Sequence, residues 1–284
     1  MRLKVLHTVD DALGYAAETQ SGHKRLALVP TMGFLHQGHL SLVREANRRA
    51  DVTVLSLFVN PTQFGPKEDL ARYPRDEKGD LEKCEASGVD AVFAPSADEI
   101  YPKGYQTFVE VERLSRGLEG ASRPGHFRGV ATVVTKLLAL FRPQFAIFGE
   151  KDYQQLQIIR ALNRDFHFGA EIVGMPIVRE ADGLAMSSRN AYLTPDERQR
   201  ASALWRGLQA AQRLAFRGVS QASPLKESVR RELQAARIQE EYIELVSAST
   251  LERIESLAFA PQARILLAAL LGTTRLIDNI GLEG

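Results

Sequence analysis

The chain has 284 residues, which is enough for a sizeable hydrophobic core and for two domains. Its formal net charge of +1 gives no overall attraction to nucleic acid or to an anionic membrane surface. The single cysteine, Cys84, excludes an internal disulfide framework and a zinc site built from several cysteines. No apolar run has the length of a membrane span and the N-terminus does not resemble a secretory signal, so we expect a cytoplasmic protein.

The first predicted elements are a strand, a glycine-bearing turn and a helix. The apolar run 26–29 precedes the turn, and a helical pattern from Leu42 to Ala50 follows it. This order points backbone N–H groups at a phosphate. His36 and His39 lie at the mouth of the helix, and they share one face if the turn is already helical there. The sequence therefore predicts a nucleotide-phosphate site built from imidazoles, and the alternative is that the two histidines only cap the helix or lie on its surface.

The same turn departs from two better-known phosphate loops. The segment 33–40 reads G-x-x-x-x-G-H-L, whereas a Walker P-loop requires Lys and then Ser or Thr at its last two places. Those places are occupied by His39 and Leu40. The G-x-G-x-x-G dinucleotide fingerprint is also absent from this turn. The sequence thus disfavours a kinase, a P-loop ATPase and a dehydrogenase.

Strand-like and helix-like segments continue to alternate in the first part of the chain. Further strands are expected at 52–59, 90–94, 145–148 and 172–178, and helices at 130–141 and 153–162. Such alternation predicts a mostly parallel sheet with right-handed crossovers. We therefore expect an α/β fold, a Rossmann-like doubly wound parallel sheet, over residues 1–178.

The pattern changes after about Val178. Thr194 and Pro195 form an expected helix start, and the helix is predicted to run to near Arg217 with Gly218 as its stop. Strand-like runs follow at 242–246, 265–270 and 275–277. Residues 179–284 are therefore expected to form a smaller C-terminal α+β domain, and this division places Lys151 and Arg189 in different domains.

Polar residues follow two of the predicted strands. Asn60 and Gln63 come after the strand at 52–59, and the segment 149–152 follows the strand at 145–148. Since the carboxyl ends of parallel strands share one sheet edge, these residues are expected to line one crevice with the first turn. Lys151 would supply a positive charge for phosphate, while the Gln63 amide can both donate and accept hydrogen bonds. The alternative is a simple turn and a solvated helix start.

The segment 122–129 is the densest cationic loop of the chain. Arg123 and Arg128 could fork onto a carboxylate or phosphate, or they could stabilise the loop or a subunit contact, and both interpretations stay open. No constellation surrounds the remaining histidines, which we expect at the surface or in the core: His7, His23 and His167.

Five motifs resemble a known family when they are taken together. They are VPTMGFLHQGH, FVNPTQFGPKEDLARYPR, LEGASRPGHFRGVATVVTKL, FGEKDYQQL and MSSRN. In this order and spacing they resemble the pantothenate synthetase (pantoate–β-alanine ligase) family, from about Leu26 to the LIDN near the end. The HxGH motif alone would indicate only the wider superfamily of nucleotidylyltransferases and class I aminoacyl-tRNA synthetases. The segment 217–239 matches weakly.

The resemblance implies a two-step reaction. Pantoate attacks the α-phosphate of ATP to give pantoyl adenylate and pyrophosphate, and the amine of β-alanine then attacks the acyl carbon and expels AMP. The implied substrates are pantoate, β-alanine and ATP, with Mg²⁺ accompanying the triphosphate. The resemblance also implies a cytoplasmic homodimer, with no nucleic-acid or membrane partner.

The resemblance further assigns site residues. Gln63 and Gln155 match the glutamines that hold pantoate, and Gln63 also faces β-alanine. His39 occupies the position assigned as catalytic, and we group His36 and Lys151 with it. The implied ATP-binding residues are Met32, Gly33, Phe34, Leu35, His36, Gln37, Gly38, His39, Gly149, Glu150, Lys151, Asp152, Val178, Met186, Ser187, Ser188 and Arg189.

The physical chemistry of adenylation suits positive charges and N–H donors aimed at the phosphates, since charge develops there. Electrostatic stabilisation of the transition state is accordingly a stronger assignment for His39 than proton donation. The metal ligands stay unassigned, with Asp80 and Glu150 as candidate neighbours of a metal ion.

Two alternatives to a ligase remain. A nucleotidylyltransferase would transfer AMP or CMP to a phosphorylated substrate and stop there. The second alternative is a nucleotide-binding or RNA-binding module without catalysis, which the near-zero net charge and the set of phosphate-binding candidates disfavour.

Overall fold

The computed structural model describes residues 3–66, 68–260 and 262–283. The chain forms two compact units. The first runs to Glu150 and also includes Ile158–Pro176, while the second contains Lys151–Gln157 and continues from Ile177. The second unit therefore starts two residues before the expected boundary, and it takes in a short segment that we expected in the first domain. Within the described ranges, no helix combines the length and the apolar character needed to cross a membrane.

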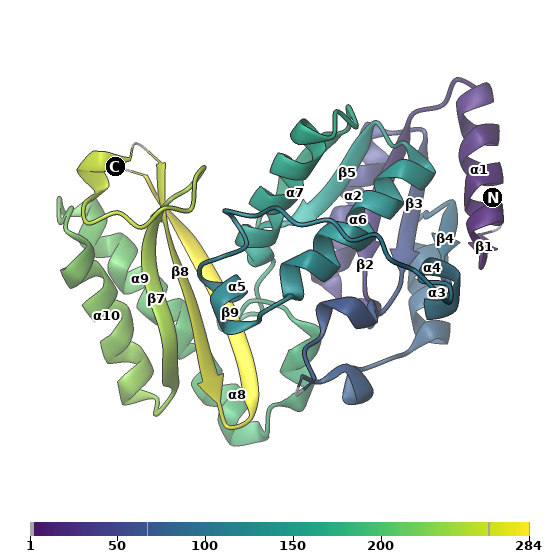
Figure 1. Ribbon diagram of the computed structural model, residues 1–284. Coiled ribbons are helices and arrows are strands. Elements are labelled where there is room, and N and C mark those ends of the chain that lie inside the picture. The colour runs from purple at the N-terminus through teal and green to yellow at the C-terminus, as the bar shows by residue number, and fades with distance from the viewer. Residues whose placement is uncertain (1–2, 67, 261, 284) are drawn as a thin grey trace. The chain divides into compact units, whose positions relative to one another are not determined.

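The first unit is built on a six-stranded sheet in which every neighbouring pair is parallel (Figure 1). The strand order is β1-β4-β3-β2-β5-β6. The strands are β1 (Lys4–Leu6), β2 (Leu26–Thr31), β3 (Val52–Leu57), β4 (Ala91–Phe93), β5 (Phe145–Gly149) and β6 (Glu171–Met175). The parallel α/β sheet expected from the sequence is thus present. The last strand ends earlier than predicted, because Pro176 has no backbone N–H to continue a ladder.

Helices cover both faces of this sheet, because successive strand residues point to opposite sides. The helices are α1 (Val9–Ser21), α2 (Gln37–Arg49), α3 (Glu77–Ala86), α4 (Ala97–Ile100), α5 (Glu119–Ser122), α6 (His126–Phe141) and α7 (Tyr153–Asp165), with short 3-10 turns η1 (Pro61–Gln63), η2 (Leu70–Arg72) and η3 (Glu150–Asp152). On one face Ala27 and Val29 join Val43 of α2 in one buried cluster. On the other, the Phe93 and Phe141 rings lie edge to face at 5.5 Å.

The order of the strands defines where a ligand can bind. β2 lies between β3 and β5. After β2 the chain adds β3 and β4 on one side of it, and it then returns to add β5 and β6 on the other side. Such a reversal leaves a crevice at the carboxyl ends of the strands. The turn before α2 follows β2, and η1 follows β3, so two of the predicted site segments leave the sheet at this edge.

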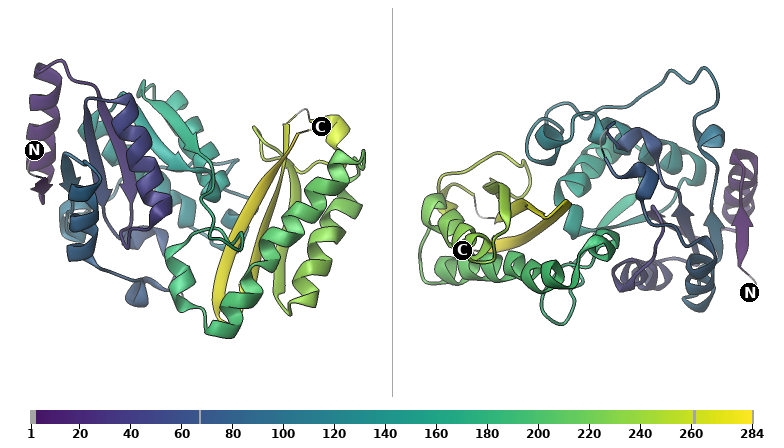
Figure 2. Two further views of the ribbon diagram at one scale, coloured as in Figure 1. Left: turned by 180° about the vertical axis from the view of Figure 1, so that it is seen from behind. Right: turned by 90° about the horizontal axis from the view of Figure 1, so that it is seen from below.

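The second unit contains a three-stranded antiparallel sheet in the order β7-β8-β9. α9 and α10 pack against each other and cover one face of this sheet (Figure 2). Its elements are η4 (Ser188–Tyr192), α8 (Pro195–Ala201), α9 (Ala203–Phe216), α10 (Ala222–Ala235), β7 (Gln239–Ser247), η5 (Leu257–Phe259), β8 (Gln262–Leu271) and β9 (Thr274–Glu283). The predicted start at Thr194 is confirmed by a capping box with Glu197, but the expected single helix is broken at Ser202.

Candidate functional site

The two histidines of the HxGH motif cap α2. His36 is the N-cap residue, and its Nδ1 accepts a hydrogen bond from the Gly38 N–H at 3.1 Å. The His36 N–H donates in turn to Nδ1 of His39 at 3.3 Å, and the two ring centroids lie 4.1 Å apart. This is a capping box in which both side chains are imidazoles. The capping role raised as an alternative from the sequence is therefore real.

The cap hydrogen bonds are made by the Nδ1 nitrogen of each ring. Because Nδ1 accepts in both rings, it carries no proton there, and the hydrogen bonds assign the Nε2–H tautomer to His36 and His39. Each imidazole is then a neutral N–H donor in a fixed orientation. The positive end of the thirteen-residue helix α2 lies beside them, which favours an anion. Capping and phosphate binding use different nitrogens and are compatible.

Asp80 shapes the loop that leads to these histidines. Its buried carboxylate accepts hydrogen bonds from the N–H groups of Phe34 and Leu35, both at 2.7 Å. The loop needs this support, since Phe34 has a positive φ of 53°. Gly33 also has a positive φ, and a Cβ there would lie 3.0 Å from the Asp80 carboxylate. The Asp80 carboxylate thus holds the backbone of this loop.

Gln63 meets the same loop from η1. The Gln63 side chain is buried, and its Nε2 donates to Sδ of Met32 at 2.8 Å. Its Oε1 accepts from Nδ2 of Asn60 at 3.2 Å, which fixes the orientation of the amide. Two segments that the sequence assigned to different ligands, the loop at Met32 and the turn at Gln63, are therefore in direct contact.

Gly149 and Glu150 belong to the first unit, whereas Lys151, Asp152, Gln155, Val178 and the segment 186–189 belong to the second. Nδ2 of Asn279 donates to the Lys151 carbonyl at 2.9 Å, and the Tyr153 hydroxyl donates to the Ala248 carbonyl at 3.0 Å. These bonds join the start of α7 to the C-terminal sheet. Lys151 and Arg189 consequently belong to one unit, and their expected placement in different domains is wrong. Gln155 lies on the same segment and is partly buried.

The loop at 186–189 rests on contacts that the sequence did not predict. The Met186 N–H donates to the Val178 carbonyl at 3.0 Å, and Oγ of Ser187 accepts from the Arg189 N–H at 3.3 Å. Just before this loop, Arg179 binds both oxygens of the buried Asp278 at 2.6 and 2.9 Å. Asp278 lies in the LIDN segment, 99 residues after Arg179, and no local pattern in the sequence pairs the two.

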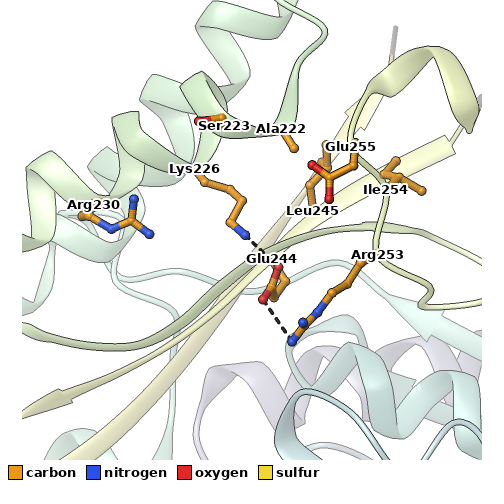
Figure 3. Close-up of a pocket in the computed structure, with 9 residues that line it drawn as sticks. All are labelled: Ala222, Ser223, Lys226, Arg230, Glu244, Leu245, Arg253, Ile254 and Glu255. Atoms are coloured by element: carbon orange, nitrogen blue, oxygen red, sulfur yellow. Dashed lines mark hydrogen bonds and ion pairs between the residues drawn. The ribbon is translucent and has the colours of Figure 1, made fainter.

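A polar pocket lies elsewhere in the second unit, between α10 and β7 (Figure 3). Lys226 and Arg253 both point at the Glu244 carboxylate, at 2.8 and 3.1 Å. The lining of this pocket, as far as the chain is described, includes none of the predicted site residues. This pocket is therefore not the candidate active site.

In the described part of the chain, no group of three or more His, Cys, Asp or Glu side chains is placed to hold a metal ion.

Comparison with known proteins identifies the family. The family model for pantoate-beta-alanine ligase matches residues 4–281. The chain is 65% identical over 281 residues to the pantothenate synthetase of Myxococcus xanthus, covering 99% of this chain and 96% of that protein. It is 50% identical to the pantothenate synthetase of Geobacter sulfurreducens, covering 98% of each chain.

Solved structures agree. The pantoate-beta-alanine ligase of Thermus thermophilus superposes with a TM-score of 0.94 at 43% identity, covering 99% of this chain and 100% of that one. The Francisella tularensis pantoate-beta-alanine ligase, described as complexed with β,γ ATP and β-alanine, gives a TM-score of 0.82 at 33% identity and covers 98% and 97% of the two chains. The resemblance stated from the five motifs is confirmed. The chain belongs to the pantoate-beta-alanine ligase family, enzymes that condense pantoate and β-alanine in an ATP-dependent reaction.

Proposed function

We propose that this chain catalyses the condensation in two steps through pantoyl adenylate. A carboxylate oxygen of pantoate attacks the α-phosphorus of ATP, and the bond from that phosphorus to the bridging oxygen of the β-phosphate breaks, releasing pyrophosphate. The amine of β-alanine then attacks the acyl carbon of the adenylate. The amine loses a proton, AMP leaves with the electron pair of the acyl–oxygen bond, and the amide of pantothenate remains.

This proposal depends most on one observation, that His36 and His39 cap α2 through Nδ1 and carry their proton on Nε2. Their Nδ1 atoms are committed to the helix cap, so the Nε2–H groups of His36 and His39 are fixed donors beside the positive end of α2. Donors that are already oriented stabilise the charge that develops on the α-phosphoryl oxygens and on pyrophosphate. We assign His39 and His36 to this role, together with the ammonium group of Lys151.

ATP is proposed to contact the loop Met32–His39, the segment Gly149–Asp152, Val178 and the loop Met186–Arg189. Lys151 and Arg189 are proposed to bind the phosphates because both side chains carry a positive charge. No covalent intermediate with a side chain is required, so none of these residues is assigned as a nucleophile.

Pantoate is proposed to bind Gln63 and Gln155, and β-alanine to bind Gln63. A small hydroxy acid offers a carboxylate and hydroxyl groups but few apolar atoms, so its pocket must pair polar groups. In the Gln63 amide, the contacts to Met32 and Asn60 use one N–H and one lone pair, and an amide has two of each. A second N–H and a second lone pair are thus left for a substrate, as judged from the described residues.

Magnesium is proposed to travel with ATP. Since Mg²⁺ in nucleotide sites is held mainly by phosphate oxygens and water, its binding fits a site that offers no protein cage among the described residues. When bound, it would screen the charge of the triphosphate. A homodimer in the cytoplasm stays part of the proposal, and light scattering of the purified chain would test the dimer.

Exchange of labelled pyrophosphate into ATP tests the two-step reaction. We expect exchange that requires pantoate and proceeds without β-alanine, because adenylation is then reversible on its own. Exchange that also requires β-alanine would overturn the separate adenylate step.

The glutamine assignment is tested with the same exchange assay and with calorimetric titration of ATP. Gln63→Ala and Gln155→Ala should each raise the KM for pantoate, because each lost polar contact weakens pantoate binding by about 1–3 kcal/mol. ATP binding should stay nearly unchanged. Loss of ATP binding with an unchanged pantoate requirement would place these glutamines at the nucleotide instead.

A further inference from the structure

A buried histidine lies directly behind Gln63. Nδ1 of His126 is 2.9 Å from the backbone carbonyl oxygen of Gln63. A carbonyl can only accept, so Nδ1 carries the proton and donates it. Nε2 of the same ring lies 3.1 Å from the Arg123 guanidinium, which can only donate, so Nε2 accepts. The two contacts therefore specify one neutral tautomer of His126.

Arg123 is itself held in place. Its guanidinium forks onto the two carboxylate oxygens of Glu68 at 2.9 and 2.6 Å. The Arg123 side chain is only 11% exposed and that of Glu68 24% exposed, so this is not a loose surface pair. Burial, and next the Arg123 charge, lower the pKa of His126 to about 4, which keeps the ring neutral near pH 7. A connected row of side chains thus leads from Glu68 through Arg123 and His126 to the Gln63 carbonyl.

The backbone packing around Gln63 leaves little freedom. A Cβ at Gly129 would lie 2.4 Å from the Thr62 carbonyl oxygen, so the first turn of α6 touches η1 without any side chain between them. Nδ2 of Asn60 donates both to Oε1 of Gln63 and to the Gly129 carbonyl, the latter at 3.1 Å. Asn60 holds the side-chain end of Gln63. At its backbone end, the Gln63 carbonyl accepts from His126 at 2.9 Å and, over a longer contact of 3.5 Å, from Arg123.

We propose that His126, oriented by Arg123 and Glu68, is a positioning residue that fixes the Gln63 backbone and so directs the Gln63 amide to pantoate. This inference rests on the proposed role of Gln63. It also gives Arg123 a role, since its guanidinium orients the histidine and has no need to contact a substrate.

The decisive comparison is between two amide replacements at position 126. An Asn amide can occupy the place of Nδ1 and still donate to the Gln63 carbonyl, whereas the longer Gln places its amide near Nε2. We expect His126→Gln to raise the KM for pantoate about tenfold, and His126→Asn to stay within about threefold of the wild type. The KM for ATP should change by less than about twofold in both variants.

His23→Asn serves as the matched control, because His23 is exposed and Asn tolerates its positive φ of 53°. Equal effects of Asn and Gln at position 126 would overturn the inference, since they would mean that only the volume of the ring matters. A rise in the ATP KM equal to that for pantoate would overturn it as well.

Gln63→Ala in the same assay separates this inference from the proposed function. If Gln63→Ala raises the pantoate KM and His126→Gln does not, the assignment of Gln63 stands and the positioning role of His126 is wrong. If Gln63→Ala leaves the pantoate KM unchanged, the assignment of Gln63 to pantoate fails, and the role of His126 fails with it.

Discussion

His36 and His39 each divide their work between two ring nitrogens. Nδ1 of each ring accepts a backbone N–H at the start of α2, and the proton is therefore on Nε2. A lysine in the same place would bring a full charge on a flexible stem. The imidazoles bring less charge, but their N–H groups have a fixed orientation. Donors that are already oriented stabilise the transition state without having to move as charge develops.

We expect His39→Ala to slow formation of pantoyl adenylate by about a hundredfold or more, because it removes an oriented donor. The folded state should lose only about 0.5–1.5 kcal/mol, the contribution of one cap hydrogen bond. Single-turnover formation of the adenylate measures the first effect and urea unfolding the second. Adenylate formation at a near wild-type rate would contradict the assignment.

His36→Asn is the matched control for capping. Asn is among the best N-cap residues, so α2 should keep its stability while the Nε2 donor of His36 is lost. Slower adenylation with unchanged unfolding would separate the two functions of the ring.

Asp80→Asn should damage the loop at Phe34 and Leu35. One of the two loop N–H groups would face the amide NH₂ instead of an oxygen, which costs about 1–3 kcal/mol of stability for the unpaired buried group. Urea unfolding checks the stability and calorimetry checks ATP affinity, which should fall. Asp98→Asn, at an exposed position of α4, is the control and should change neither. If Asp80→Asn were as stable as the control, the carboxylate would not brace the loop.

At the scale of elements, local patterns predicted most of the fold. The apolar run before the HxGH motif predicted β2, and Thr194 with Pro195 predicted the start of α8. The break at Ser202 was missed because both flanking segments keep helical spacing. The support of Gln63 by His126 was missed for a different reason. The contact joins segments 63 residues apart, and the cationic loop that contains His126 carries no local sign of a contact to the Gln63 backbone.

Gly129→Ala should disturb the contact between α6 and η1. The added Cβ would meet the Thr62 carbonyl at 2.4 Å, so the two elements must separate, at a cost of about 1–3 kcal/mol. The pantoate KM should rise as Gln63 shifts. Gly14→Ala in α1 is the control, since a Cβ at Gly14 would meet no described atom within 4 Å, and it should stabilise the fold by about 0.5–1 kcal/mol. Thermal unfolding of both variants, with pantoate kinetics, tests this. Equal stabilities would contradict the close packing.

At the scale of the whole molecule, the proposed ATP-binding residues divide between the two units. His36 and His39 belong to the first unit, while Lys151 and Arg189 belong to the second. The sequence placed Lys151 after the strand β5, which is correct, but it could not show that the next turns of chain are bound to the C-terminal sheet.

The free energy of unfolding should depend on pH through His126. Burial lowers its folded-state pKa from 6.5 to about 4, so below pH 6.5 the unfolded chain binds a proton that the folded chain does not. This contribution leaves stability unaffected above pH 6.5 and lowers it as the pH falls towards 4, by up to roughly 3 kcal/mol. Urea unfolding from pH 7.5 to 4 of the wild type and of His126→Asn isolates it, because other groups cancel in the difference. Parallel pH profiles would show that His126 does not titrate in this way.

The segment Lys151–Gln157 makes the second unit discontinuous along the chain. A gene fragment encoding only residues 177–284 would lack Tyr153, whose hydroxyl binds the Ala248 carbonyl and whose ring centroid lies 3.9 Å from the Arg264 guanidinium carbon. If that fragment were exchanged between two relatives by a single crossover, the C-terminal sheet of one parent would be combined with the segment 151–157 of the other parent. Chimaeras of this family should therefore be assembled with two exchanged pieces, and the short internal piece should come from the same parent as the C-terminal one.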